Sequence, residues 1–302
     1  MRESGTAPYY APPNHNRFPD ATALARPRRQ TRCAGVHRRP HSPTPIACFM
    51  MHLLLLPGMD GSGALFAAFI TALDNRCKVT VVSYPPQAAL SYHELESIAR
   101  TFVPQNEPYV ILGESFSGPI AVSLAATAGP QLRGLILCAT FVRNPRPRLG
   151  WLRPFLGITP VSKLPPATLS PILFGRWTSA TLRDQLTRAL KPVSPPALRA
   201  RLQAVMAVDV SNRLQKIRVP VMYIQAQQDR LVPMQSGELI QRLRPDVQFI
   251  KIEAPHLVLQ TVPQAAAGLV ADFLLELDSE PSSDTTSRLR GNDQALADKT
   301  GN

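Results

Sequence analysis

The sequence has few cysteines, little charge and no long hydrophobic run, and each shortage excludes a class of protein. Its four cysteines among 302 residues lack the short paired spacing of a disulfide scaffold or a zinc cluster. The apolar run Leu53–Leu56 is far shorter than the roughly 18–20 residues that span a bilayer. With 44% hydrophobic and 18% charged residues, the chain is neither fibrous nor disordered on average. We therefore expect a globular protein with free thiols and no membrane span, located in the cytoplasm.

Half of the net charge of +12 lies in the first 49 residues. Residues 1–49 carry eight arginines, two acidic residues and eight prolines, and they show no apolar periodicity that could bury a face. We expect this leader to be disordered. A transit peptide, a basic arm for nucleic acid or lipid, and translation that begins at Met50 or Met51 are all compatible with it. We favour the late start, and we expect no nucleic-acid partner.

The rest of the chain divides into one domain and a tail. Residues 278–302 are polar and almost without large apolar side chains, which predicts a disordered tail. Residues 50–277 form one predicted domain in which β-rich apolar runs alternate with helical patterns, the signature of a parallel sheet. The predicted strands are 52–57, 78–84, 109–114, 132–139, 219–226 and 247–252, and the predicted crossover helices are 91–103, 116–128, 234–243 and 262–277.

One gap between strands is too long for a single crossover. It covers 79 residues between Ala139 and Val219, with many prolines and helical patterns at 178–190 and 196–208. We expect an inserted helical lid at residues 141–217.

A serine follows the third predicted strand in the sequence Gly113-Glu114-Ser115-Phe116-Ser117-Gly118. A sharp turn between strand and helix exposes a serine hydroxyl above the sheet, where the start of the helix favours negative charge. The usual pattern is G-x-S-x-G, and here Ser117 replaces its last glycine. The sequence predicts Ser115 as a nucleophile, although an ordinary Gly/Ser turn gives a similar pattern.

The base and the acid follow by elimination among few residues. His52 opens a buried strand and His93 lies on a predicted helix, whereas His256 follows the last strand, at the sheet edge where such folds build their sites. Asp229 follows the strand before it. The order Ser115, Asp229, His256 is that of α/β-hydrolases. We predict that these three residues form a catalytic triad.

The glycine-rich sequence LLLLPGMDGSG, residues 53–63, follows the first strand. Acyl transfer needs backbone N–H groups for an oxyanion, normally the one after the nucleophile and one from an earlier loop. We assign these donors to Phe116 and Met59. A phosphate loop is the alternative, but no Lys-Ser/Thr pair follows.

These segments resemble those of the α/β-hydrolase fold serine hydrolases, and the resemblance covers residues 51–277. The chain is similar to small capped esterases, including pimeloyl carrier-protein methyl ester esterases, and to the hydrolase part of plant esterase/lipase/thioesterase acyltransferases. It departs in having Pro57 where many members have histidine, and in lacking the usual first hairpin. The resemblance implies a mostly parallel sheet of about six strands, with helices on both faces and a helical lid.

The implied activity is that of a carboxylic ester hydrolase with an acyl-enzyme on Ser115 and without metal or cofactor. Its partner is a small acyl ester, either free or bound to a carrier protein that arginines near the lid would attract. The lid aromatics either line an acyl pocket or form the lid's own core; they are Trp151, Phe155, Phe174 and Trp177. The alternatives are a thioesterase or acyltransferase with the same triad, and a catalytically silent binding protein. The sequence leaves the oligomeric state open.

Overall fold

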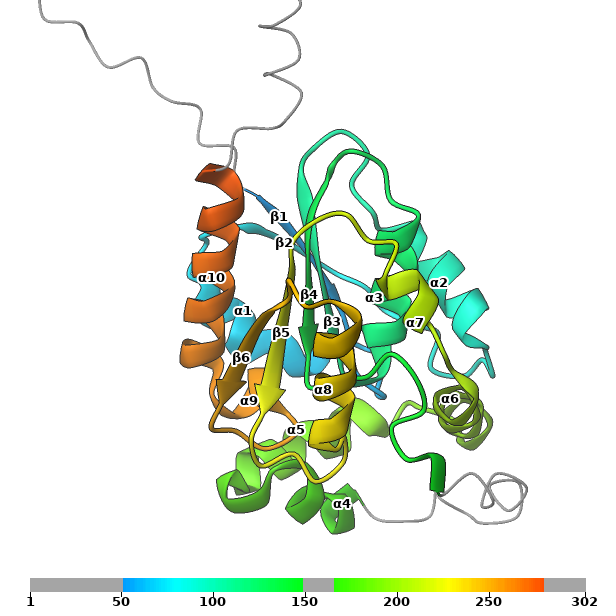
Figure 1. Ribbon diagram of the computed structural model, residues 1–302. Helices are drawn as coiled ribbons and strands as arrows, with labels where there is room; N and C mark the ends of the chain where they lie inside the picture. Colours follow the sequence, from blue (N-terminus) through cyan, green and yellow to red (C-terminus); the bar gives the residue numbers. More distant parts are fainter. Residues whose placement is uncertain (1–50, 149–165, 280–302) are drawn as a thin grey trace, which may run out of the picture. The chain divides into compact units, whose positions relative to one another are not determined.

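The computed structural model describes residues 51–148 and 166–279, and a parallel six-stranded sheet forms the centre of this part (Figure 1). The strand order is β2-β1-β3-β4-β5-β6, and every pairing is parallel. The strands are β1 (His52–Leu56), β2 (Lys78–Val81), β3 (Tyr109–Glu114), β4 (Leu132–Cys138), β5 (Val221–Ala226) and β6 (Gln248–Ile252). All six predicted strands are confirmed.

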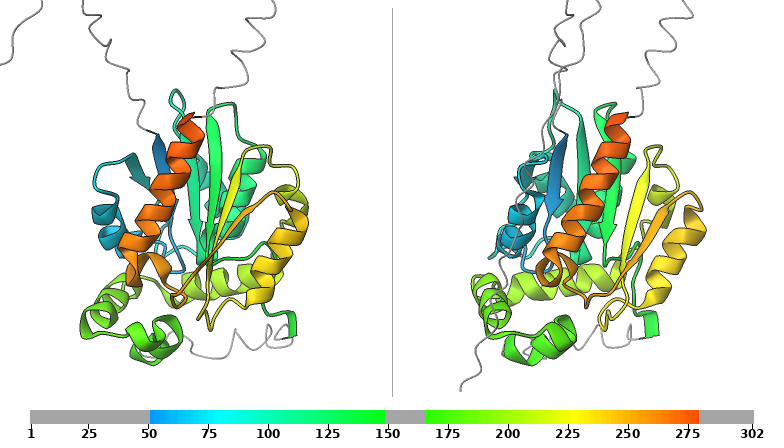
Figure 2. Two further views of the ribbon diagram at one scale, coloured as in Figure 1. Left: turned by 60° about the vertical axis from the view of Figure 1, so that its left-hand side comes forward. Right: turned by 90° about the vertical axis from the view of Figure 1, so that its left-hand side faces the viewer.

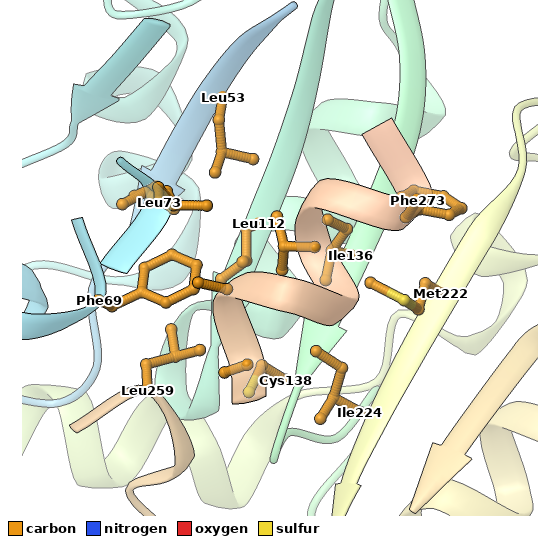
Figure 3. Close-up of a cluster of buried hydrophobic side chains, with 14 of the residues drawn as sticks. Leu53, Phe69, Leu73, Leu112, Ile136, Cys138, Met222, Ile224, Leu259 and Phe273 are labelled. Atoms are coloured by element: carbon orange, nitrogen blue, oxygen red, sulfur yellow. The ribbon is translucent and has the colours of Figure 1, made fainter. Parts of the chain in front are cut away.

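Helices cover both faces of the sheet, which explains why its inner strands are apolar without alternation. Leu53 and Leu55 of β1 pack on one face with α1 (Ala67–Leu73) and α10 (Pro263–Ser279). Figure 3 shows Leu53 on the same face as Leu73 of α1 and Phe273 of α10. Leu54 and Leu56 pack on the other face. The helices of that face are α2 (Tyr92–Arg100), α3 (Gly118–Ala126), α7 (Ser211–Leu214) and α8 (Met234–Leu243).

The four predicted crossover helices are present, as α2, the 3-10 turn η2 (Ser115–Ser117) with α3, α8, and α10. The Ser91 and Glu94 side chains cap the start of α2 reciprocally. The short elements η1 (Ala64–Phe66), α1 and α9 (Val258–Thr261) were not predicted. The predicted tail begins too early, because burial of Leu274 and Leu277 holds α10 on the sheet and the helix continues to Ser279.

The chain between β4 and β5, here called the insertion, contributes α4 (Pro166–Leu173), η5 (Gly175–Trp177), α5 (Ala180–Leu190), α6 (Pro195–Ala207) and α7. The two helices predicted in this segment are confirmed as α5 and α6. Figures 1 and 2 show α4, α5 and α6 beneath the carboxyl ends of the strands. That they act as a lid stays a prediction. The predicted leader and residues 280–302 lie outside the described residues.

Candidate active site

Ser115 lies on a tight turn between β3 and α3, with a φ of 49°. This positive φ is rare for a residue with a side chain and is often found at functional positions. The turn needs glycine on both sides: a Cβ on Gly113 would lie 2.6 Å from the Ala121 Cβ, and one on Gly118 would lie 2.0 Å from Thr140 Oγ1. The Thr140 hydroxyl donates to the Ser115 carbonyl. Close packing therefore holds the serine at the carboxyl edge of the sheet.

Ser115, His256 and Asp229 form one hydrogen-bonded chain. Ser115 Oγ lies 2.7 Å from His256 Nε2, and His256 Nδ1 lies 2.8 Å from Asp229 Oδ2. The backbone N–H groups of Leu231 and Val232 both donate to Asp229 Oδ1, each at 2.8 Å. The His256 and Asp229 side chains are only 2% and 1% exposed. Both carboxylate oxygens are thus engaged, and one of them orients the imidazole toward the serine.

The other two histidines of the domain have different surroundings. His52 is buried at the start of β1, with Nδ1 2.8 Å from Glu107 and Nε2 2.7 Å from Thr80. His93 lies exposed on α2. The structure therefore brings His256, alone among these three histidines, to Ser115.

A cavity of about 320 Å³ opens beside the triad and is lined by Ser115, His256, Glu114, residues of the loop after β1, and the insertion. The described residues of the insertion that line it are all apolar: Leu169, Ile172, Leu173, Leu186, Leu190, Val193, Leu198 and Leu202. Leu231 and Leu257 extend this wall from the loops that carry the acid and the histidine. Such a wall suits a hydrocarbon chain held next to Ser115.

Of the predicted lid aromatics, the two that the structure describes, Phe174 and Trp177, do not line the cavity. Phe174 is completely buried and packs with Leu186 and Leu257, one layer behind the cavity surface. Trp177 lies on η5 with the Arg176 guanidinium 4.3 Å from its ring centre. Trp151 and Phe155 lie outside the described residues. In the described part of the insertion, aliphatic side chains, Leu173 among them, make up the wall instead.

The two predicted oxyanion donors both belong to the surroundings of Ser115. Met59 lines the cavity with Ser115, and Phe116 directly follows the serine. The Phe116 ring stacks on Tyr92 with ring centres 4.8 Å apart, and the Tyr92 hydroxyl donates to the Phe116 carbonyl at 2.9 Å. That their N–H groups bind an oxyanion stays a prediction.

Ser117, the departure from the usual pattern, does not strain the turn. Its φ of −86° lies in the ordinary helical region, so glycine is not required there. Its hydroxyl donates to the Pro57 carbonyl and lies 2.9 Å from the Tyr84 hydroxyl. The serine therefore ties the nucleophile turn to the loop that follows β1.

Glu114 is a site residue that sequence reasoning missed. It lines the cavity yet is only 1% exposed, and burial raises its pKa to about 7, with the nearby Asp60 carboxylate acting in the same direction. Gln260 Nε2 donates to Glu114 Oε2 at 3.3 Å, while Glu114 Oε1 has no hydrogen-bond partner. The sequence feature that could have identified Glu114 is its position directly before Ser115, at the end of β3.

The described residues lack two kinds of feature, a metal-binding cluster and a membrane-spanning helix. Residues 51–148 and 166–279 contain no group of three or more His, Cys, Asp or Glu side chains that could hold a metal ion. None of the helices in these ranges is long and apolar enough to cross a bilayer.

Comparison with known proteins relates the chain to one family. Residues 53–269 match the model of the "Alpha/beta hydrolase family". The chain is 26% identical over 247 residues to a pimeloyl-[acyl-carrier protein] methyl ester esterase of Methylococcus capsulatus, an alignment that covers 74% of this chain and 94% of that protein. It is 30% identical over 231 residues to a protein of the same name from Xanthomonas oryzae pv. oryzae, covering 66% and 85%.

Solved structures show the same fold. The enol-lactonase from Burkholderia xenovorans LB400 superposes with a TM-score of 0.64 at 17% identity, covering 75% of this chain and 92% of that one. At this identity the likeness concerns the fold alone.

Proposed function

Because this chain belongs to the alpha/beta hydrolase family, we propose that it is a carboxylic ester hydrolase that works through an acyl-enzyme on Ser115. The observation that carries the proposal is the hydrogen-bonded chain from Ser115 through His256 to Asp229, placed at the wall of an apolar cavity. The names of its relatives agree with this reaction class.

The proposed reaction has two halves. Ser115 Oγ attacks the ester carbonyl while its proton passes to His256 Nε2, and Asp229 stabilises the resulting imidazolium through Nδ1–H. The negative oxygen of the tetrahedral intermediate accepts hydrogen bonds from the Met59 and Phe116 N–H groups. The C–O bond to the alcohol breaks as His256 returns the proton to it. Water then attacks the acyl-enzyme with His256 again as base, which releases the acid and frees Ser115.

The substrate we propose is an ester with an apolar acyl chain. The described residues of the insertion line the cavity with leucine, isoleucine and valine side chains, so moving a hydrocarbon chain from water into the cavity is favourable. The two relatives described above carry a name that specifies a methyl ester on an acyl carrier protein. We therefore propose a carrier-linked acyl methyl ester as the physiological substrate.

Arginines near the start of the insertion support a carrier-bound substrate. Arg146 donates to the carbonyls of Arg230 and Leu231, next to the cavity wall, and Arg143 and Arg148 lie close to it in the chain. Positive side chains at this place would attract an acidic carrier protein.

We also propose that the enzyme works in the cytoplasm. Cys77 and Cys138 are buried free thiols, and thiols persist in that reducing compartment.

The proposal is tested with p-nitrophenyl esters from acetate to palmitate, hydrolysed by the full chain and by its Ser115→Ala variant. We expect the variant to lose activity and to resist a fluorophosphonate probe that labels the wild type. Each added CH2 buried in the cavity should raise kcat/KM by about fourfold, until the cavity is full. If the wild type hydrolysed no ester and Ser115 remained unlabelled, the proposal would be wrong and a silent binding protein would take its place.

The same triad serves acyl transfer, so the products need to be identified as well. Ester formation with an added alcohol, at the expense of free acid, would assign the chain to the acyltransferases. A preference for a thioester over the matching oxygen ester would assign it to the thioesterases.

A further inference from the structure

Arg201 is a buried cation that neither the sequence motifs nor the proposed mechanism uses. It lies in the middle of α6 and is only 1% exposed, although arginine is seldom fully buried without partners. Its guanidinium leaves the insertion and enters the body of the domain, where it contacts loops that follow β1 and β2.

The guanidinium binds three backbone carbonyls. Nη1 donates to the Met59 carbonyl at 2.8 Å and to the Asp60 carbonyl at 3.0 Å, and Nη2 donates to the Pro85 carbonyl at 3.2 Å. Met59 and Asp60 are consecutive, so one rigid side chain fixes two successive peptide planes. These planes directly follow the Met59 N–H that we assign to the oxyanion.

Gly61 provides the space that the guanidinium occupies. A Cβ at this position would lie 2.7 Å from Arg201 Nη1 and 2.9 Å from Nη2, and the φ of +70° is one that favours glycine. The Gly61 N–H closes a turn by donating to the Gly58 carbonyl at 3.1 Å. That carbonyl belongs to the same peptide group as the Met59 N–H. The arginine therefore packs directly on the residue that orients this group.

The loop that contains Met59 is also held at two neighbouring peptide groups. The Ser117 hydroxyl binds the Pro57 carbonyl, one peptide earlier, and the Tyr84 N–H donates to the Gly61 carbonyl at 2.7 Å. The body of the domain supplies these two contacts. Among the described residues, the hydrogen bonds of Arg201 tie this loop to the insertion.

The Asp60 carboxylate balances the charge of Arg201. Asp60 is 4% exposed, and its carboxylate accepts hydrogen bonds from the N–H and the hydroxyl of Ser62. Burial lowers the pKa of Arg201, and the Asp60 carboxylate opposes that effect by favouring the charged form. A neutral side chain at position 201 would leave the three carbonyls without this donor.

Helix α6 is anchored at its start. The Ser194 N–H donates to the Pro86 carbonyl at 2.9 Å, and the Ser194 hydroxyl donates to the Gln87 carbonyl at 3.1 Å. The same hydroxyl caps α6 by accepting from the Ala197 N–H. Since Leu198 and Leu202 of α6 line the cavity, the helix that carries Arg201 also forms part of the substrate-binding wall.

We propose that Arg201 is a positioning residue that couples the insertion to the oxyanion loop, so that the Met59 N–H is held in place only while α6 is docked on the body of the domain. This inference rests on the proposed function, because it concerns an oxyanion donor. Arg201 does not touch the reacting atoms, and it acts through the Met59–Gly61 backbone.

The test compares Arg201→Met, Arg201→Lys and Arg201→Ala with the wild-type full chain. With a short p-nitrophenyl ester, we expect Arg201→Met to lower kcat by about 10- to 100-fold with KM changed less than threefold, since one oxyanion donor is worth about 10²–10³ in kcat. Arg201→Lys should recover only part of kcat, because an ammonium lacks the planar fork. Added guanidinium chloride at low concentration should partly restore Arg201→Ala by filling the vacated site.

A boronic acid inhibitor separates positioning from a merely structural role. Its tetrahedral adduct on Ser115 places an oxygen where the oxyanion would lie, so its inhibition constant should rise by the same factor as kcat/KM falls. Loss of stability alone would lower the midpoint of thermal unfolding and leave kcat per folded molecule unchanged. The matched control is Arg188→Met, an exposed arginine on α5, which should leave both constants unchanged.

The outcomes distinguish this inference from the proposed function. If the wild type is a Ser115-dependent esterase but folded Arg201→Met keeps kcat within twofold, the inference is wrong while the proposed function stands. Should Arg201→Met fail to fold, a kcat within twofold of wild type for Arg201→Lys would overturn the inference equally. Absence of esterase activity and of Ser115 labelling in the wild type would remove both proposals.

Discussion

Glu114 allows a quantitative prediction about the dependence of stability on pH. Its carboxyl is fully buried beside Ser115, and burial raises its pKa from the ordinary 4.5 to about 7. One pKa unit corresponds to about 1.4 kcal/mol, so ionising Glu114 costs the folded state about 3 kcal/mol relative to the unfolded chain. Replacement by glutamine removes the ionisation and keeps an acceptor for Gln260 Nε2.

The raised pKa of Glu114 sets the direction in which the free energy of unfolding changes with pH. Between pH 4.5 and about 7 the folded protein holds a proton on Glu114 that the unfolded chain has released. The contribution of this group to the free energy of unfolding therefore falls as pH rises through this window and is constant above it. We expect Glu114→Gln to match the wild type near pH 4.5 and to exceed it by about 3 kcal/mol at pH 8.5.

The assay is urea unfolding of both proteins at half-unit steps from pH 4.5 to 8.5. Subtracting the two curves cancels every other titrating group. Glu238→Gln, an exposed glutamate on α8, serves as the control and should keep the wild-type curve. A difference between wild type and Glu114→Gln that stays constant with pH would refute the reasoning, since it would show that Glu114 does not titrate in this window.

Three further predictions concern the turn, the acid and the buried histidine. Gly118→Ala should lower the free energy of unfolding by about 1–3 kcal/mol in urea, because the added Cβ meets Thr140 Oγ1. The control Gly268→Ala, where a Cβ would meet no atom within 4 Å, should raise the free energy of unfolding by up to about 1 kcal/mol. Equal effects of the two substitutions would contradict the packing argument. Asp229→Asn should lower kcat by about 10⁴-fold in the ester assay, and a loss below tenfold would exclude it as the orienting acid. His52→Leu should cost about 1–3 kcal/mol of stability and leave kcat per folded molecule unchanged; a large loss of kcat would reopen the choice of base.

The fold was predictable because the residue types of the inner strands reflect the burial of those strands on both faces. Strands covered on both faces must be apolar at every position, as in Leu53–Leu56, and such runs are visible without any partner. The positions of Ser115, Asp229 and His256 followed for a related reason. Each lies in the loop or turn that follows a strand, and parallel strands bring their carboxyl ends to one edge of the sheet.

The rest depended on contacts that no local pattern records. Arg201 lies 142 residues from the Met59 carbonyl that it binds, and on its own helix it resembles any charged residue of an exposed face. Phe174 was a reasonable choice for a substrate pocket, yet packing of the insertion against Leu257 turned it inward and left aliphatic side chains at the surface of the cavity. Aromatic character predicts burial better than it predicts which layer a side chain occupies.

The strand order affects how late in synthesis or folding the proposed active site becomes complete. Ser115 and His256 are 141 residues apart, and His256 follows β6, which pairs with β5 at the edge of the described sheet. At a synthesis rate of about 5–20 residues per second, roughly 7–30 s separate the emergence of the serine from that of its base. During this interval a nascent chain carries the proposed nucleophile without the proposed base. Recovery of hydrolysis during refolding would therefore lag behind formation of the central strands and report the docking of the last one.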